Sequence, residues 1–349
     1  MRILELNTEK TWRGGERQTI YDLLGYRMQG NESFTICRAG YPLAEHCIGN
    51  NLPFKTINNH FQLLYFLMFK SRSFDIIHCQ TSKTQQLAVF TKWFHGKKVV
   101  YTRRLDFVPK GFLSITKYKL TNCIVAITPA IQKILAAANI TNTALISEVV
   151  EQKNLNKERA LKLISEQDSN GKKIIGTTAA FVQHKDPLTM VKAIHKLYQL
   201  RQDFVFYHFG NGVLMDETKQ AIAAHKLNDV YIIGGFHKNV EDVFSVLDVF
   251  VMSSEEEGLG SSVLDAFMYK VPVVSTNAGG LADVVEGNGL LSKVKDADAL
   301  AANINRILNE PELKNKLVKN AHEAALNKHS LEVISKQYSE LFSKLINAN

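Results

Sequence analysis

Two carboxylates, eight positions apart, mark the stretch of this chain best suited to bind a polar ligand. Glu257 and Asp265 lie in VFVMSSEEEGLGSSVLDAFMYKVPVVST, residues 249–276. Free backbone N–H groups at a helix start favour an anion such as a diphosphate, whereas neighbouring carboxylates suit sugar hydroxyls. The plainer alternative is that the acids at 255–257 are solvated loop charges and the serines an ordinary helix cap.

The elements that must position these carboxylates are a strand, a turn and a helix. Residues 249–252 are apolar, 253–260 are polar with glycine, and 261–269 have helical spacing. Pro272 then opens a second strand at 273–275. In an open α/β sheet, ligands bind beyond the carboxyl ends of the strands, which is where both acids are expected.

Short apolar strands alternate with helices along the rest of the chain, which predicts parallel sheets covered on both faces. The expected strands span 2–6, 33–38, 53–57, 75–79, 98–102, 123–128, 173–177, 204–209 and 230–233. The expected helices include 61–71, 84–94, 130–138, 157–165, 188–200, 215–225 and 240–247, with a helical end from 298 onward.

The chain is long enough for two domains. A polar stretch at 147–171 is the expected junction, which gives an N-terminal domain at 1–150 and a second domain at 151–330. The apolar run at 61–69 is too short to span a bilayer, and the N-terminus lacks the pattern of a signal peptide. We therefore expect a cytoplasmic protein, with Cys37, Cys47, Cys79 and Cys123 as reduced core thiols.

The net positive charge of the chain lies in its first half. Residues 1–150 contain 19 Lys and Arg against 9 Asp and Glu, while the remainder contains 23 against 25. Such an imbalance indicates an anionic partner, namely a phosphorylated substrate, an anionic membrane surface or nucleic acid, unless the charge serves only solubility. The paired Gly14 and Gly15 follow the first strand, but the sequence is not GxGxxG, so a dinucleotide site is poorly supported.

Several segments of the second half, in this order, resemble the retaining nucleotide-sugar glycosyltransferases of family 4. They are GTTAAFVQHKDPL (176–188), FGNG (209–212), DVFVMSSEEEGLGSSVLDAF (248–267), PVVSTNAGGLADVV (272–285) and NGLL (288–291). ILELNTEKTWRGGERQ (3–18) is similar to the N-terminal loop of the family. The resemblance implies a GT-B fold, with two facing Rossmann-like domains, a central cleft, and a last helix (331–349) that packs back on the first domain.

The resemblance also implies roles for individual residues. Glu257 matches an acid that contacts the donor sugar, and Asp265, where the family usually has glutamate, matches the acid that holds the ribose. Lys185 matches the lysine that binds the donor diphosphate, where charge develops as the glycosidic bond breaks. The other expected donor-binding residues are His184, Phe236, Gly258, Leu259, Gly260, Ser261, Gly279 and Gly280 in the second domain, with Gly14 and Gly15 in the first.

A departure from the family is Ala180, where an arginine is common. We expect Arg103 or Arg104 to supply that charge; the alternative is that both are surface or acceptor-side charges. Asp106 is the expected acceptor-side polar group, and His78 is expected to be a hydrogen-bonded core residue.

The function implied is metal-independent transfer of a sugar, with retention, from a nucleotide-sugar to a glycan or lipid-linked acceptor. No cofactor is expected; the co-substrate is taken as a UDP-sugar, although GDP and ADP donors stay open.

Aromatic residues mixed with cations in the first half fit contact with an anionic membrane or ordinary core packing, and no motif indicates nucleic-acid binding. The segments WRGGERQ and EGLGSSVLDAF are most similar in sequence to those of bacterial lipopolysaccharide-core and surface-glycan enzymes. A sugar-nucleotide epimerase, a transferase with a soluble acceptor and a non-catalytic nucleotide-sugar-binding protein are the alternatives.

Overall fold

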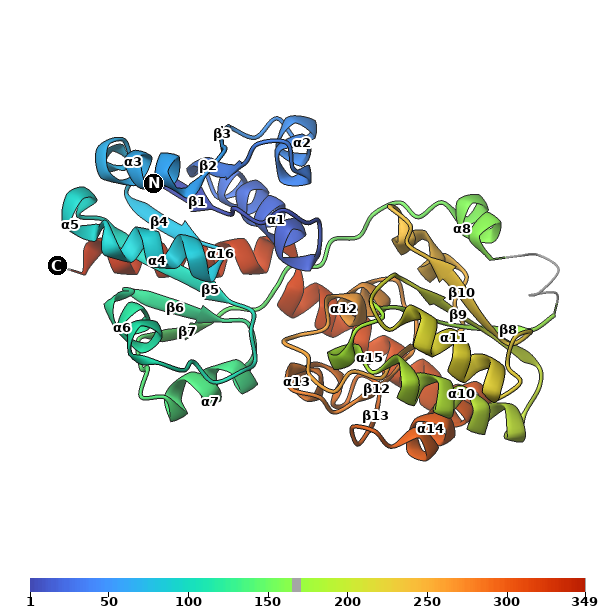
Figure 1. Ribbon diagram of the computed structural model, residues 1–349. Helices are drawn as coiled ribbons and strands as arrows, with labels where there is room; N and C mark the ends of the chain where they lie inside the picture. The colour runs from blue at the N-terminus through green and yellow to red at the C-terminus, as the bar shows by residue number, and fades with distance from the viewer. Residues whose placement is uncertain (165–170, 349) are drawn as a thin grey trace. The chain divides into compact units, whose positions relative to one another are not determined.

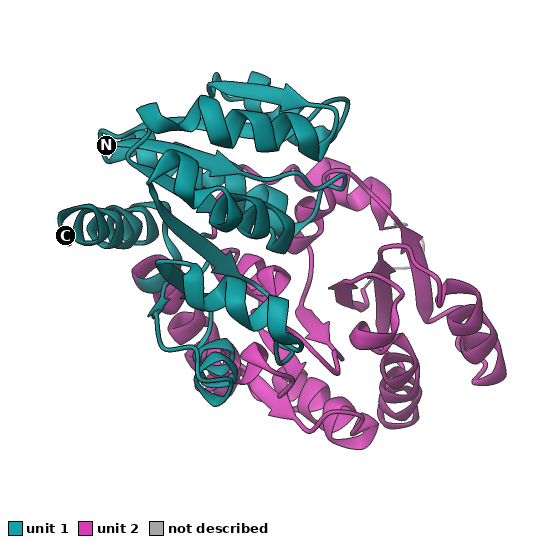
Figure 2. Ribbon diagram, turned by 60° about the vertical axis from the view of Figure 1, so that its left-hand side comes forward, with its two compact units in different colours: residues 1–149, 328–349 teal, residues 150–327 magenta. Residues whose placement is uncertain are grey.

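The computed structural model describes residues 1–164 and 171–348, which form two compact units, each built on one parallel sheet (Figure 1). The first unit comprises 1–149 and 328–349, and the second comprises 150–327 (Figure 2). The chain thus passes from the first unit to the second at Val149 and returns near the end of helix α15 (Pro311–His329).

The sheet of the first unit has the strand order β3-β2-β1-β4-β5-β6-β7. The central strands of this sheet are almost entirely buried, because helices cover both faces of a parallel sheet. They span β1 (Arg2–Leu6), β2 (Glu32–Arg38), β3 (Phe54–Ile57), β4 (Ile76–Cys79), β5 (Lys98–Arg103), β6 (Cys123–Ala126) and β7 (Thr143–Leu145). The helices of this unit are α1 (Gly14–Met28), α2 (Pro42–Gly49), α3 (His60–Phe69), α4 (Ser82–Phe90), α5 (Lys92–His95), α6 (Phe112–Leu120), α7 (Pro129–Ala137) and α16 (Leu331–Asn347), with the short 3-10 turn η1 (Ser71–Ser73).

Helix α16 belongs to the first unit although it ends the chain. Its residues Ile334, Tyr338 and Phe342 are buried in the core of that unit. The helix packs against α1, where a Cβ added to Gly25 would stand 2.6 Å from the Cβ of Ser335. The missing side chain of Gly25 therefore allows the two helices to approach each other.

The sheet of the second unit has the order β10-β9-β8-β11-β12-β13, again with parallel pairs. Its strands are β8 (Lys173–Thr178), β9 (Phe204–Phe209), β10 (Tyr231–Gly235), β11 (Val249–Met252), β12 (Val273–Thr276) and β13 (Leu290–Ser292). Its helices are α8 (Lys157–Leu163), α10 (Pro187–Leu200), α11 (Met215–Ala224), α12 (Ser261–Met268), α13 (Gly280–Val285), α14 (Ala297–Asn309) and α15, with the 3-10 segments η2 (Gln183–Lys185) and η3 (Val240–Ser245).

The predicted parallel sheets are confirmed, and two of the predicted helices are wrong. The single helix expected at 84–94 is two helices, because the Thr91 hydroxyl donates back to the carbonyls of Leu87 and Ala88 where α4 ends. The helix expected at 240–247 is the 3-10 segment η3. Helices α2, α6 and α13 and strands β7 and β13 were not predicted. Ser165, the expected end of α8, lies outside the described residues.

The four cysteines are buried and free, as predicted. Among the residues the structure describes, every helix is too short or too polar to cross a lipid bilayer.

Candidate functional site

Three loops meet at the carboxyl edge of the second sheet. Strands β8, β11 and β12 are neighbours, so the segments that follow them, at 179–186, 253–260 and 277–279, emerge side by side. Figure 1 shows helices α12 and α13 beginning from these segments. This is the edge at which open α/β sheets bind ligands, and it carries most of the predicted donor-binding residues.

Hydrogen bonds join these loops into one framework. The amides of Glu255 and Glu256 donate to the His184 carbonyl at 2.9 and 3.3 Å. The Ser253 hydroxyl donates to the carbonyls of Lys185 and Asp186. These bonds fix the loop after β8 against the loop after β11. His184 thus contributes its backbone carbonyl to this framework.

A second set of bonds fixes the loop after β12. The amide of Gly280 donates to the Glu257 carbonyl at 2.8 Å, and the Thr276 hydroxyl donates to the Ser254 carbonyl at 2.6 Å. Gly279 has φ +48°, a backbone conformation that side chains rarely adopt, and it is exposed. The backbone at Gly279 and Gly280 is therefore tied to the segment that carries Glu257.

Within this framework Lys185 and Glu257 form an ion pair. The Lys185 ammonium donates to Oε2 of Glu257, and the two side chains are 19% and 15% exposed. They come from positions 72 residues apart that were selected separately from the sequence. A cation and a carboxylate held together but still accessible can bind an anionic group and a hydroxyl group side by side.

Helix α12 begins directly beside this pair. Gly260 is its N-cap with φ +81°, and a Cβ there would collide with Leu281. Glycine is thus required for the sharp entry into the helix, whose first N–H groups favour an anion. Ser261 is the first residue of the helix and Asp265 lies one turn further on; both are half-buried.

Leu259 was predicted to bind the donor. The residue is only 3% exposed. The backbone of Leu259 and of the neighbouring Gly258 is what this segment can offer to a ligand.

The loop that carries Ala180 is anchored from below by His208. One ring nitrogen of His208, Nε2, donates to the Ala179 carbonyl at 3.0 Å, and Nδ1 accepts from the Tyr231 hydroxyl at 2.7 Å. The ring also stacks on Phe181, with centroids 3.9 Å apart. Burial lowers the pKa of His208 to about 3, so the ring is neutral at physiological pH.

The FGNG segment after β9 faces the same loop. A Cβ at Gly210 would collide with the Ala179 carbonyl, and a Cβ at Gly212 would collide with the Phe181 carbonyl. These glycines let the two loops lie backbone to backbone, which explains the motif in physical terms. Phe236, just beyond β10, is 67% exposed and so is accessible to a ligand.

In the first unit, Arg103 requires a correction. It was predicted to bind the donor, but it is 1% exposed and each of its guanidinium nitrogens donates within its own unit. The acceptors are the carbonyls of Leu105 and Phe107 and the Tyr118 hydroxyl. Those two carbonyls flank Asp106, so Arg103 shapes the loop that carries this half-buried residue.

Arg104 lies at the carboxyl edge of the first sheet. Its Nε donates to Glu148 at 2.6 Å and its Nη1 donates to Gln80. A Cβ at Gly15 would lie 3.8 Å from the Arg104 side chain, so the glycines at the start of α1 are close to this arginine. Gly14 is the first residue of α1.

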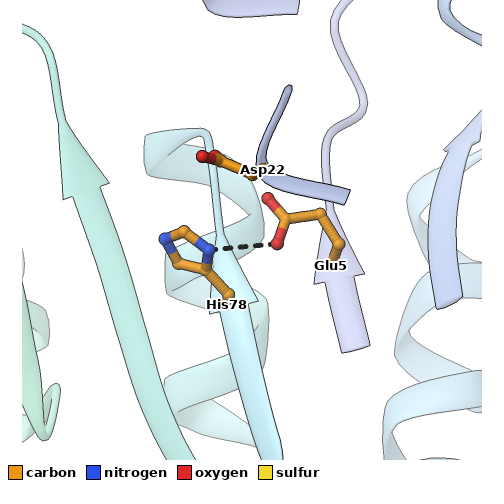
Figure 3. A group of neighbouring side chains, drawn as sticks. All are labelled: Glu5, Asp22 and His78. Atoms are coloured by element: carbon orange, nitrogen blue, oxygen red, sulfur yellow. Dashed lines mark hydrogen bonds and ion pairs between the residues drawn. The ribbon is translucent and has the colours of Figure 1, made fainter. Parts of the chain in front are cut away.

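Behind Arg104 lies a buried polar cluster that the sequence analysis missed apart from His78. Figure 3 shows its members Glu5, Asp22 and His78, which come from β1, α1 and β4. His78 is fully buried, with Nδ1 3.0 Å from Glu5 and Nε2 2.7 Å from the Thr102 hydroxyl, so its predicted core role is confirmed. A charged residue inside the apolar strand RILEL was the available signal for Glu5.

The ligand atoms of Glu5, Asp22 and His78 lie within 4.8 Å of one another, which is close enough for a metal ion. The Gln80 amide, however, donates to both carboxylates, at 2.8 Å to Asp22. Burial and the neighbouring Glu5 raise the pKa of Asp22 to about 7. Both carboxylates therefore already accept from a protein N–H group, and the cluster fits a structural role better than a metal site.

Comparison with known proteins agrees with this geometry. Residues 161–324 match the family model described as "Glycosyl transferases group 1". The lipopolysaccharide core biosynthesis glycosyltransferase LpsE of Rhizobium meliloti is 25% identical over 241 residues, which are 66% of this chain and 66% of that protein. The 2-deoxystreptamine glucosyltransferase of Streptomyces kanamyceticus is 31% identical over 40% of this chain and 38% of its own length. The chain thus aligns with less than two thirds of the length of each of these two relatives.

Solved structures show the same fold. A glycosyltransferase from Rickettsia africae ESF-5 has a TM-score of 0.86 at 21% identity, with 100% of this chain and 99% of that chain covered. Anabaena Alr3699/HepE in complex with UDP and glucose has a TM-score of 0.84 at 19% identity, with 99% and 100% covered. Residues 161–324 are thus similar to the group 1 glycosyl transferases, and the two parallel-sheet Rossmann-like units of the chain have the GT-B fold.

Proposed function

We propose that this protein is a glycosyltransferase that moves a sugar from a nucleotide-sugar to a glycan or lipid-linked acceptor in bacterial surface-glycan biosynthesis. The observation that carries the proposal is the accessible Lys185–Glu257 pair, held beside the start of α12 by the loop framework of a group 1 domain. The names of the rhizobial relative and of the putative glycosyltransferase EpsD of Bacillus subtilis support the general class.

The donor has a consistent place in this site. Lys185 and the first N–H groups of α12 bind the diphosphate, where negative charge grows as the glycosidic bond breaks. Glu257 accepts hydrogen bonds from hydroxyls of the donor sugar, and Asp265 accepts them from the ribose. We propose a UDP-sugar as the donor, which the UDP complexes of Anabaena HepE support.

The reaction that we propose is retaining and independent of metal. In it, the acceptor hydroxyl attacks the face from which the diphosphate departs, and a diphosphate oxygen takes its proton. We propose Asp106 of the first unit as a polar contact for the acceptor. Arg104 is the more accessible of the two arginines that were expected to supply a cation for the diphosphate. A lipid-linked acceptor implies peripheral contact with the inner face of the cytoplasmic membrane.

The test is to incubate the purified protein with UDP-, GDP- and ADP-sugars, with and without membrane or lipopolysaccharide acceptor, and to follow nucleotide release. Release of UDP that depends on acceptor and yields a glycosylated product is the expected result. Free epimerised nucleotide-sugar would instead identify an epimerase, and binding without release for every acceptor would identify a non-catalytic binding protein.

A further inference from the structure

A stripe of aromatic side chains on helix α3 faces solvent. Phe61, Tyr65 and Phe69 follow one another at four-residue intervals, which places them on one side of the helix. They are 81%, 59% and 57% exposed. The opposite side, with Leu63 and Leu67, is fully buried, so α3 already has a core face and the aromatic stripe is additional to it.

The neighbouring helices extend this stripe. Helix α3 packs against α4 and α5, and Nε of Arg72 donates to the Phe94 carbonyl at 2.9 Å. Trp93 on α5 is 95% exposed, and Phe94 and Phe90 beside it are also exposed. We refer to the six aromatic residues Phe61, Tyr65, Phe69, Phe90, Trp93 and Phe94 as the aromatic face; Figure 1 shows α3, α4 and α5 together in the first unit.

The surroundings of the aromatic face are strongly cationic. Between residues 60 and 98 the chain has a single acid, Asp75, whose carboxylate accepts from the Arg2 amide at 2.7 Å. The cations of this segment are Lys70, Arg72, Lys83, Lys92, Lys97 and Lys98. In the part of the chain that the structure describes, their recorded bonds are to carbonyl oxygens, as for Lys92 with Leu120 and Lys98 with Ala348, and none is ion-paired to a carboxylate.

We propose that the aromatic face docks on an anionic lipid bilayer. Trp, Tyr and Phe side chains insert at the level of the lipid headgroups, and unpaired Lys and Arg beside them are attracted to acidic phospholipids. The charge complementarity selects an anionic membrane over a second copy of this chain, since two such faces would repel each other. This inference rests on the proposed function, because docking on a membrane is useful to a transferase whose lipid-linked acceptor lies in that membrane.

Vesicle flotation tests the proposal with the full chain and without donor or acceptor. The vesicles are phosphatidylcholine alone or mixed with phosphatidylglycerol, at low and high salt. The key variant is the double substitution Phe61→Ser with Trp93→Ser, which removes two highly exposed side chains. Its matched control is Leu200→Ser with Val213→Ser, which removes two side chains that are 62% and 87% exposed in the second unit.

We expect the wild-type protein and the control to bind the phosphatidylglycerol vesicles, more weakly at high salt, and the double variant to bind at least about tenfold less tightly. Binding that is equal for the two vesicle types, binding that the double variant retains, or self-association without vesicle binding would each overturn the proposal. Nucleotide release with a soluble acceptor is measured in parallel. Vesicle binding without any transfer would overturn only the proposed function, and transfer without vesicle binding would overturn only the docking surface.

Discussion

At the scale of single residues, Lys185 and Glu257 are the pair on which the account of the donor site depends. Each was selected from its own motif, and the structure brings the two side chains into contact. Their motifs are detectable because glycines, serines and acids interrupt apolar runs. Neither motif indicates that the two side chains meet, because that contact results from β8 and β11 being neighbours in the sheet.

The replacement Lys185→Met is expected to weaken UDP binding by roughly ten- to a hundredfold, since a charge-assisted hydrogen bond to phosphate contributes about 1.5–3 kcal/mol. Titration calorimetry measures the change. Lys219→Met is the control, because Lys219 is paired with Asp216 on the exposed surface of α11. An unchanged dissociation constant for Lys185→Met would remove this lysine from the donor site.

His208 makes the second unit sensitive to acid. Its pKa is about 3 in the folded protein, below the ordinary value of 6.5, because the ring is buried. The contribution of His208 to the stability of the fold is therefore complete above pH 6.5. It is lost as the pH falls from 6.5 toward 3, because in that range the unfolded chain binds a proton at this histidine and the folded protein does not. At pH 5 the loss relative to pH 7.5 is about 2 kcal/mol.

The measurement is urea unfolding at both pH values for the wild-type protein and for His208→Gln. The variant lacks the titrating ring, so its free energy of unfolding should fall by about 2 kcal/mol less between pH 7.5 and pH 5. Equal losses for the two proteins would contradict the buried neutral histidine.

Arg103 and Arg104 show what residue patterns cannot resolve. They are adjacent basic residues at the carboxyl end of β5, and sequence reasoning treated them alike. The structure separates them, because Arg103 is enclosed by Tyr118 and two loop carbonyls whereas Arg104 reaches Glu148 and Gln80. The difference arises from α6, a helix that the sequence analysis did not predict and that supplies Tyr118.

At the scale of elements, the strands were easier to predict than the helices that cover them. Fully buried parallel strands are short runs of mainly apolar residues, as β4 and β9 illustrate with one histidine each. Helix α2 begins at a proline after a short loop and α6 begins after Gly111, and each is too short for its periodicity to be distinctive. The pairing of α16 with α1 joins positions about 300 residues apart, and it was expected only from the resemblance.

The contact between α1 and α16 depends on Gly25. Alanine there should destabilise the first unit by about 1–3 kcal/mol, because its Cβ would stand 2.6 Å from Ser335 and 3.3 Å from Leu331. Gly49→Ala, at the end of α2, is the matched control, since a Cβ there has nothing within 4 Å. Thermal unfolding of both variants provides the measurement, and a Gly25→Ala variant as stable as the control would contradict the close packing.

At the scale of the whole molecule, the chain combines two units of different character. The first unit carries the net positive charge and the aromatic face, and the second carries the loop framework with Lys185 and Glu257. This division is consistent with the proposed function, in which the donor is a small anionic molecule and the acceptor lies at a membrane. Composition predicted the charge imbalance, but only the structure shows that the aromatic residues of α3 and α5 are exposed and not part of the core.

The measurement that tests the central claim most directly is the rate of acceptor-dependent UDP release by Glu257→Gln. This variant keeps the size of the side chain and removes the negative charge beside Lys185. Glu217→Gln, on the first turn of α11, is the control. We predict that release falls at least about a hundredfold for Glu257→Gln with an unchanged melting temperature, and that the control matches the wild-type protein. A rate for Glu257→Gln equal to that of the wild-type protein would contradict the donor site described for this chain.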